Sequence, residues 1–269
     1  MTAPRDDPPP AHLSAAEDER PSALPASRPR SRLVLLEEVT VVLSLSLLAS
    51  AVFALISLFE APVRPSVQVR LFAPVSLARQ LAEIVFDLAP VALVLHLARR
   101  DGEDLGEFGL STARLGRDVG WGTLLGLGVA GAGLVLYLAS LTLAVNRFVV
   151  PIPPTGHWWT VPVLLLGSAR SALLEEVVVV GYLVRRLEQV GLDGGPAVLA
   201  SAVLRGAYHL FQGWGSFAGN LLLGLVAGWI FLRWRRTWPL VVAHFLVDAL
   251  AGLGYLAFRG DCVFGLCIP

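Results

Sequence analysis

The chain contains no lysine: all 21 basic residues among its 269 are arginine. No lysine is therefore present to act as a nucleophile or to form a Schiff base with a carbonyl substrate. Cysteine is nearly absent too, and the two that occur, Cys262 and Cys267, lie together near the C-terminal end. They exclude a disulfide scaffold and a CxxC redox centre, and they leave open one short disulfide or two thiols.

Charge is also scarce. Charged residues make up 16% of the chain, against roughly 25% in an ordinary soluble domain, whereas hydrophobic residues make up 55%. The 21 acidic residues balance the arginines, so the net charge is zero and nothing points to nucleic acid as a partner. This composition predicts an all-α polytopic membrane protein whose principal surroundings are the lipid bilayer.

The chain contains many long hydrophobic runs. The length of each run is close to the ~20 residues that an α-helix needs to cross a bilayer. The expected spans are residues 33–59, 76–98, 119–145, 159–186, 197–212, 215–233 and 238–258. Residues 1–31 precede them and are rich in proline, alanine and charge, without the apolar core of a signal peptide. We expect this segment to be a disordered tail.

The arginines predict the orientation of the spans, because positive charge gathers on the cytoplasmic side. Clusters fall at alternate ends of the spans: Arg28, Arg30 and Arg32; Arg99, Arg100, Arg114 and Arg117; Arg185 and Arg186; Arg233, Arg235 and Arg236. The opposite ends carry only Arg64, Arg70, Arg147 and Arg259. We therefore expect an integral protein of a bacterial plasma membrane, with a cytoplasmic N-terminus and a non-cytoplasmic C-terminal tail.

Ionisable residues in the first two spans have a structural explanation. Glu37 and Glu38 fall near the cytoplasmic boundary, where long polar side chains reach water. Arg79, Glu83 and Asp87 follow at i, i+4 and i+8, on one helical face, where they can pair with one another.

The later spans carry a different set of ionisable residues, contributed by three helices. These are Glu175 and Glu176 in "LLEEVVVVGYL", Arg205 and His209 in "RGAYH", and His244 and Asp248 in "HFLVD". The rise of 1.5 Å per residue puts Glu175 about 15 Å and His209 about 20 Å from the cytoplasmic edge. It puts His244 and Asp248 at about 8 and 14 Å. These groups can therefore meet in one layer of the cytoplasmic half of the bilayer.

A carboxylate with two imidazoles is suited to activating water. A glutamate can serve as a general base, one histidine can share the proton, and a second can donate to a developing oxyanion. Glu175, His209 and His244 could instead hold a divalent metal such as Zn²⁺. The helical HExxH motif is absent, so a metal site would have to be assembled across helices.

These residues, in this order, resemble the CPBP family, the Abi-type intramembrane proteases related to type II CAAX prenyl endopeptidases. The family pattern EExxxRG is similar to "EEVVVVG", FxxxH to "RGAYH", and HxxxN or HxxxD to "HFLVD". The segment "DLGEFGLS", residues 104–111, also looks like the short segment that precedes the family's core. Two positions depart from the pattern: Val180 stands where arginine is usual, and Arg205 where phenylalanine is usual.

The resemblance implies an intramembrane endopeptidase that hydrolyses peptide bonds of a membrane-embedded or membrane-proximal protein or peptide. It implies that Glu175 and His209 activate water, that His244 and Asp248 stabilise the oxyanion, and that Glu176 supports them. It implies four parts: a tail over 1–31, transmembrane helices over 32–98, the protease core over 99–258, and a tail over 259–269. A glutamate-dependent and a metal-dependent mechanism both remain open.

The two departures suggest that one cation has moved between neighbouring helices. Arg205 shares a helical face with His209, so we expect it to point toward Glu176 and neutralise the acidic pair.

Non-catalytic explanations remain beside this one. Each acid or histidine can be a hydrogen-bonded structural residue, and the branch can be a membrane scaffold or a self-immunity protein. A proton-coupled transporter would also use buried acids, although no inverted repeat is found and the polar set lies in one half of the membrane.

Overall fold

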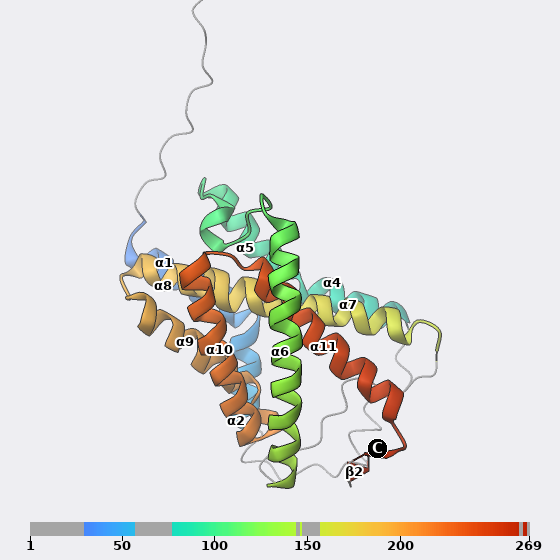
Figure 1. Ribbon diagram of the computed structural model, residues 1–269. Coiled ribbons are helices and arrows are strands. Elements are labelled where there is room, and N and C mark those ends of the chain that lie inside the picture. Colours follow the sequence, from blue (N-terminus) through green and yellow to red (C-terminus); the bar gives the residue numbers. More distant parts are fainter. Residues whose placement is uncertain (1–29, 57–76, 144–145, 147–156, 264–265, 268–269) are drawn as a thin grey trace, which may run out of the picture.

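The computed structural model describes residues 30–56, 77–143, 146, 157–263 and 266–267, which are almost entirely helical (Figure 1). The α-helices are α1 (Arg32–Ser44), α2 (Leu47–Ile56), α4 (Leu77–Asp87), α5 (Ala89–Arg100), α6 (Leu115–Thr142), α7 (Thr160–Leu173), α8 (Leu183–Val190), α9 (Gly194–Tyr208), α10 (Trp214–Trp234) and α11 (Trp238–Phe258). The other elements are the π-helix η2 (Leu174–Tyr182), the 3₁₀ turns η1 (Leu105–Phe108) and η3 (Leu210–Gln212), and the strands β1 (Cys262–Val263) and β2 (Leu266–Cys267). The expected all-α class is confirmed at this level.

Four helical stretches are long and apolar enough to cross a membrane: Leu77–Arg100, Leu115–Ala139, Trp214–Trp234 and Trp238–Phe258. A fifth candidate is α1 with α2, which bend by 61° at their junction. The expected count of seven is not confirmed. Helix α9 has 15 residues, about 22 Å by the helical rise, which is short for a bilayer core. The expected span over 159–186 is not among the candidate stretches, and it carries the charged residues Arg170, Glu175 and Glu176.

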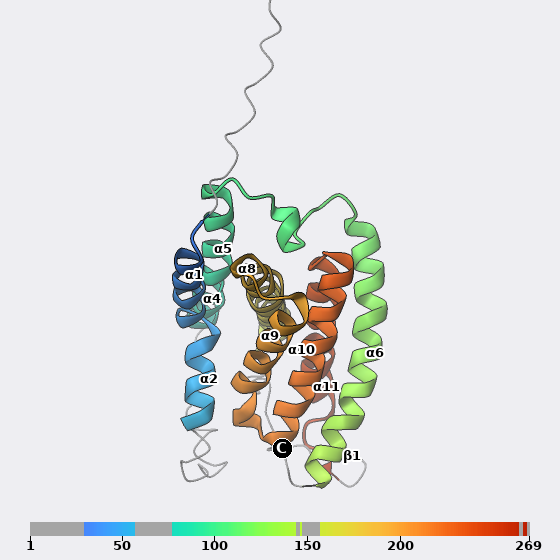
Figure 2. The ribbon, with the colours of Figure 1, turned by 90° about the vertical axis from the view of Figure 1, so that its left-hand side faces the viewer.

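A continuous helical rod, α7–η2–α8, passes through the centre of the molecule. In Figure 1 it runs across the view behind the upright α6, and in Figure 2 α8 is seen nearly along its axis. All eight residues from Glu175 to Tyr182 are buried, because the rod contacts α1, α5, α9, α10 and α11. A π-helical stretch is rare and is found preferentially at functional sites. Here it carries both glutamates of the EE motif.

Close helix packing fixes the elements around this rod. Helix α11 packs on α6, and α10 packs on α9. A Cβ added at Gly122 of α6 would lie 2.6 Å from Val242 Cβ of α11, and one at Gly228 would lie 2.6 Å from Val198 Cγ1 of α9. Small residues at such contacts allow two backbones to approach, which is how helices associate in membranes.

The glycine of the EE motif, Gly181, has a steric reason to be glycine. A Cβ at this position would lie 2.7 Å from the carbonyl oxygen of Phe108 and 2.9 Å from Thr237 Oγ1. Thr237 Oγ1 donates a hydrogen bond to Phe108 O, and Trp238 Nε1 donates to Leu110 O. The segment 104–111 is thus held between η2 and the start of α11.

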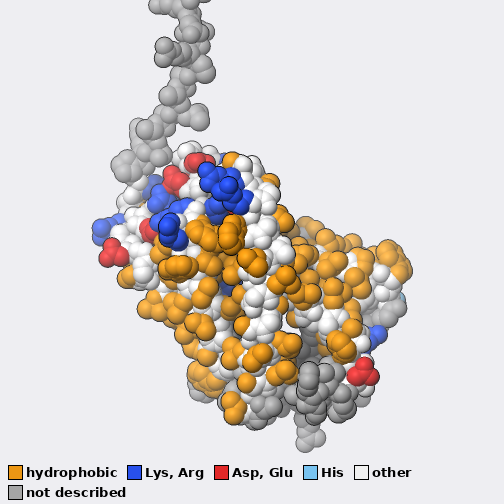
Figure 3. Space-filling view, viewed as in Figure 1, with side chains coloured by type: hydrophobic (Ala, Val, Ile, Leu, Met, Phe, Trp, Pro, Cys, Tyr) orange, Lys and Arg blue, Asp and Glu red, His pale blue; other side chains and the backbone are white. Residues whose placement is uncertain are grey.

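The surface separates into an apolar face and a charged end. Figure 3 shows hydrophobic side chains over much of the face that α6, α10 and α11 present, with charged side chains gathered near its top. Residues of α6 such as Leu124, Leu127 and Val135 are more than half exposed, as a lipid-facing surface requires. We call the charged region the arginine-rich end; its arginines include Arg100, Arg185, Arg186, Arg235 and Arg236. The expected tail, in residues 1–29, and Arg64, Arg70 and Arg147 lie outside the described residues.

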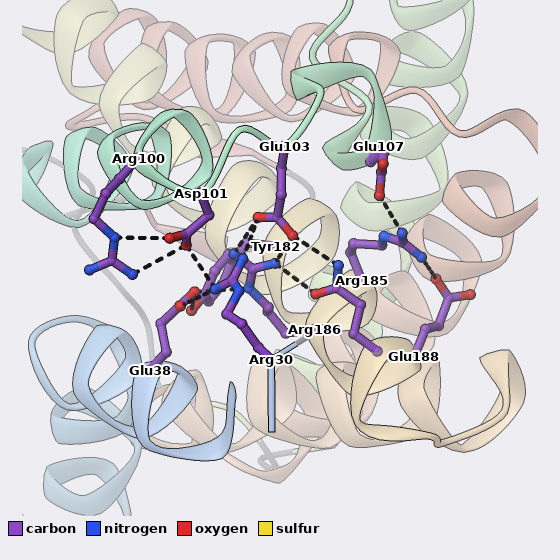
Figure 4. Close-up of polar contacts among 11 residues, drawn as sticks. Arg30, Glu38, Arg100, Asp101, Glu103, Glu107, Tyr182, Arg185, Arg186 and Glu188 are labelled. Carbon is purple, nitrogen blue, oxygen red and sulfur yellow. Dashed lines mark hydrogen bonds and ion pairs between the residues drawn. The ribbon is translucent and has the colours of Figure 1, made fainter. Parts of the chain in front are cut away.

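Ion pairs tie the helices together at the arginine-rich end (Figure 4). Arg186 of α8 is fully buried, donates to Glu103 at 2.7 Å and to Glu38 at 2.8 Å, and lies 5.1 Å from the ring centroid of Phe108. Glu38 also accepts from the Tyr182 hydroxyl at 2.8 Å. Glu38 is therefore not the water-reaching boundary residue that its position suggested, because helix packing encloses it beside two donors.

The pKa of Glu103 lies below its ordinary value. Burial alone would raise this pKa, but hydrogen bonds from Arg186 and Gln189 and the positive charges of Arg186 and Arg30 outweigh it. The carboxylate thus stays ionised inside the network and holds the connection between α5 and η1 to α8.

Candidate active site

Three elements bring the expected site residues together. Glu175 and Glu176 lie in the first turn of η2. Arg205, Tyr208 and His209 share one face at the end of α9, at i, i+3 and i+4, and His209 caps the helix as its amide donates to Gly206 O. His244 and Asp248 lie one turn apart on α11.

Glu176 is the meeting point of α9 and α11. Its Oε1 accepts a hydrogen bond from Arg205 Nη1 at 2.8 Å and lies 2.8 Å from His244 Nδ1. His244 Nε2 in turn lies 3.5 Å from Asp248 Oδ2. The histidine is therefore held between two carboxylates, one on its own helix and one on η2.

Glu175 has a separate set of neighbours, and they converge on one oxygen. Its Oε2 accepts from the Tyr208 hydroxyl at 2.8 Å, and it lies 3.5 Å from Arg205 Nη2 and 3.7 Å from His209 Nε2. On the other side of that imidazole, Gln212 Nε2 lies 3.4 Å from His209 Nδ1. Tyr208 did not stand out in the sequence, although its spacing of three from Arg205 puts it on the same helical face.

A cavity of about 120 Å³ opens beside these groups. Its polar end is formed by Glu176, Arg205, His209, Asn220, His244 and Asp248. Its walls are apolar and come from α6, α10 and α11, including Leu125, Leu223, Ile230 and Val247. Glu175 does not line this cavity; its carboxylate lies next to His209, which does. Glu176 Oε2 and Arg205 Nε are buried without a hydrogen-bond partner among the described residues.

The two departures from the family pattern occupy different surroundings. Val180 is buried among apolar residues of α8, α9, α10 and α11, including Val184, Val198 and Phe231. Arg205 reaches the acidic pair from α9 and contacts both carboxylates. The cation of this site therefore comes from the helix that also carries His209.

The side chains were tested for a metal site. Among the described residues no three His, Cys, Asp or Glu side chains are grouped so that they could hold a metal ion. A guanidinium already lies within 3.5 Å of both carboxylates, which is where a divalent cation would have to bind. The arrangement does not fit a metal held by Glu175, His209 and His244.

Other ionisable residues of the membrane helices lie outside the site. Arg170 of α7 pairs with Asp87 of α4 and with Ser171. Arg79 and Glu83 pair along α4 at 2.8 Å and are more than half exposed. Arg79, Glu83 and Asp87 were expected to pair with one another on one helical face. Arg79 and Glu83 do so, whereas Asp87 pairs with Arg170 of α7.

Comparison with known proteins finds one family whose model matches the segment that carries this site. Residues 157–250 match the family model of Type II CAAX prenyl endopeptidase Rce1-like proteins. The matched segment contains Glu175, Glu176, Arg205, His209, His244 and Asp248; α6, which supplies part of the cavity wall, lies before it. No curated protein and no solved structure matches the chain.

Proposed function

Because residues 157–250 belong to the Rce1-like family of type II CAAX prenyl endopeptidases, we propose that the protein is an intramembrane endopeptidase. Its substrate would be a membrane-embedded or membrane-proximal protein or peptide. The observation that carries the proposal is that two carboxylates and two imidazoles from three helices meet beside one cavity with apolar walls.

Glu175 and His209 are the pair assigned to water activation. His209 Nε2 lies 3.7 Å from Glu175 Oε2, so one water can contact both the imidazole and the Glu175 carboxylate. The water oxygen attacks the carbonyl carbon of the scissile peptide bond as its proton moves to Glu175. When the tetrahedral intermediate collapses, the C–N bond breaks and the leaving amine takes that proton.

His244 is assigned to the oxyanion that forms on the carbonyl oxygen. A donor that is already oriented stabilises such charge without reorganising during the reaction. Glu176 Oε1 lies 2.8 Å from Nδ1 and orients the imidazole. Nε2, which is 3.5 Å from Asp248 Oδ2 and too far for a normal hydrogen bond, is the nitrogen that donates to the oxyanion. Arg205 offsets the charge of the paired acids, whose burial without a partner would be costly.

A specific observation favours a second assignment within the same function. Glu176, rather than Glu175, lines the cavity and has a buried oxygen, Oε2, without a partner among the described residues. In that case Glu176 and His244 would activate the water. The departures at Val180 and Arg205 favour a different alternative, a non-catalytic scaffold or self-immunity protein that kept the fold.

Cleavage of a membrane-associated peptide library by the purified full-length protein tests these possibilities. Glu175→Gln and Glu176→Gln are compared in parallel, with His209→Ala, after each variant is shown to fold as the wild type does. A general base contributes about 10²- to 10⁴-fold, so the variant that loses this much identifies the base. A chelator added to the wild type reports on metal dependence. A wild type that cuts nothing contradicts the proposal and favours the scaffold.

A topology with seven crossings, in a plasma membrane and with the N-terminus on the cytoplasmic side, accompanies this proposal. The arginine-rich end would then face the cytoplasm, by the positive-inside rule.

A further inference from the structure

We propose that Tyr208 is a positioning residue for Glu175: its hydroxyl fixes one carboxylate oxygen so that the other faces the water. The inference rests on the proposed function. It starts from the Tyr208 hydroxyl, which donates to Glu175 Oε2 at 2.8 Å from a side chain that is 5% exposed.

The neighbours of Glu175 distinguish its two oxygens. Tyr208, Arg205 and His209 all approach Oε2, at 2.8, 3.5 and 3.7 Å. A carboxylate can accept hydrogen bonds on both oxygens, yet no side-chain hydrogen bond to Oε1 is found among the described residues. The tyrosine makes the shortest of the three contacts, so it decides the rotation of the carboxylate, and Oε1 remains for the water.

The tyrosine ring has little freedom to move away. It packs in an apolar cluster with Leu47 and Ala51 of α2 and Val179 of η2, and its ring lies 4.8 Å from that of His209. Tyr208 also closes the last turn of α9, before the chain continues as η3. A phenol fixed by both its ring and its helix is a rigid donor, whereas a water in its place would be free to reorient.

The chain provides a matched control. Tyr182 donates to Glu38 Oε1 at 2.8 Å, the same distance between the same two groups, and it too is buried. That pair belongs to the arginine-rich end and makes no contact with Glu175, His209 or His244. Tyr182→Phe and Tyr208→Phe therefore remove the same hydroxyl from two sites, only one of which holds the proposed base.

The first measurement is the steady-state kinetics of both variants on a peptide that the wild type cleaves. We expect Tyr208→Phe to lower kcat by about 10- to 100-fold and to leave KM within about threefold, because Tyr208 does not line the cavity. We expect Tyr182→Phe to retain the wild-type kcat. Should Tyr208→Phe not fold, Tyr208→Met fills the apolar site without a donor and is scored in the same way. Unchanged kcat in the folded variant, or equal losses in both tyrosine variants, would overturn the inference.

A second measurement does not depend on activity. Thermal unfolding of Tyr208→Phe, Glu175→Gln and the double variant forms a cycle that isolates the interaction of the two groups. We expect the shift in midpoint of the double variant to be smaller than the sum of the single shifts. Additive shifts would show that the hydroxyl and the carboxylate do not interact, and would overturn the inference.

The experiments distinguish an error in the role inferred for Tyr208 from an error in the proposed function. If Glu175→Gln is inactive while folded Tyr208→Phe is fully active, Tyr208 has no positioning role and the proposed function stands. If Glu175→Gln cuts as the wild type does, Glu175 is not the base, whatever the cycle gives.

Discussion

A pair of adjacent acids inside an apolar run raises the question of what keeps both of them there. In this chain the answer at the residue scale is a single guanidinium. Arg205 contacts Glu176 at 2.8 Å and Glu175 at 3.5 Å. In addition, Tyr208 donates a hydrogen bond to Glu175, and His244 contacts Glu176. Replacing one member of a buried ion pair lowers the free energy of unfolding far more than replacing both members by apolar residues, because the remaining charge is left without compensation.

Arg205→Leu is therefore expected to lower the free energy of unfolding by about 3–5 kcal/mol, the usual cost of breaking a buried ion pair. Activity is expected to fall with it. Chemical or thermal unfolding of the purified variant measures the first effect. A fully folded and fully active Arg205→Leu protein would contradict the role given to this residue.

The proposal that a cation has moved between helices makes a sharper prediction. Val180 lies four residues after Glu176 on the same rod, so an arginine there can reach the acidic pair from η2. We expect Val180→Arg combined with Arg205→Phe to recover part of the stability and activity that Arg205→Phe alone loses. Val180→Arg alone is the control, and it is expected to destabilise because two cations would then meet. A double variant no better than Arg205→Phe would argue against an exchange of positions.

At the scale of elements, the π-helix η2 stands between two anchored helices. The Arg170–Asp87 pair holds α7 to α4, and the Arg186 pairs hold α8 to α1 and to the α5–η1 connection. Tyr182, the last residue of η2, itself contacts Glu38 and lies under the Arg186 guanidinium. The network at the arginine-rich end therefore anchors the end of η2 that is farther from the two glutamates.

Arg186→Met removes the buried charge while keeping a long side chain, and it leaves Arg30 as the cation that Glu38 and Glu103 still share. We expect it to lower the free energy of unfolding by about 3–5 kcal/mol, as for a broken buried pair. Arg235→Met is the control, since the Arg235–Glu188 pair lies at the same end with the arginine 44% exposed. Such exposed pairs contribute about 0–1 kcal/mol. Equal losses in the two variants would contradict the importance given to burial.

Lowering the pH should destabilise the folded protein through this network. Because the pKa of Glu103 is lower in the folded protein, the unfolded chain binds this proton more readily. The stabilisation is present above the ordinary pKa of 4.5 and is lost as pH falls below it toward the folded value. Unfolding midpoints recorded from pH 7 down to pH 3 should fall, and Glu103→Gln should flatten this dependence. Glu37→Gln, at an exposed position of α1, should keep the wild-type slope.

At the scale of the whole molecule, the arginine-rich end and the apolar face together predict how the protein is oriented in the membrane. Arginines that are scattered along the sequence gather at one end, while α6 runs from that end to the opposite one (Figures 1 and 3). The positive-inside rule then predicts which end faces the cytoplasm.

Labelling of single cysteines tests that orientation. With Cys262 and Cys267 replaced by serine, Thr112→Cys puts a thiol just before α6 and His157→Cys puts one after it, both at exposed positions. A membrane-impermeant thiol reagent applied to intact cells should label position 157 at once and position 112 only after permeabilisation. The reverse pattern would contradict the predicted orientation, and labelling of both positions from one side would contradict the crossing between them.

The sequence by itself determined which ionisable residues make up the candidate site, and it determined the membrane character of the chain. Both follow from local properties: an ionisable group in an apolar run stands out wherever the helix lies, and a spacing of four puts His244 and Asp248 on one face. The depth of each group, estimated from a constant rise, also sufficed to expect that the groups would meet in one layer.

Only the tertiary structure decided which groups meet and how. Arg205 lies 29 positions from Glu176, and His244 lies 68 positions from it. Contacts at such separations depend on how the helices cross, which no local pattern encodes. The π-helical form of η2, the burial of Glu38 beside Arg186 and the hydroxyl of Tyr208 on Glu175 have the same origin. The expected count of seven crossings is not confirmed for a related reason, because an apolar run through the centre of a helical protein has the composition of one that faces lipid.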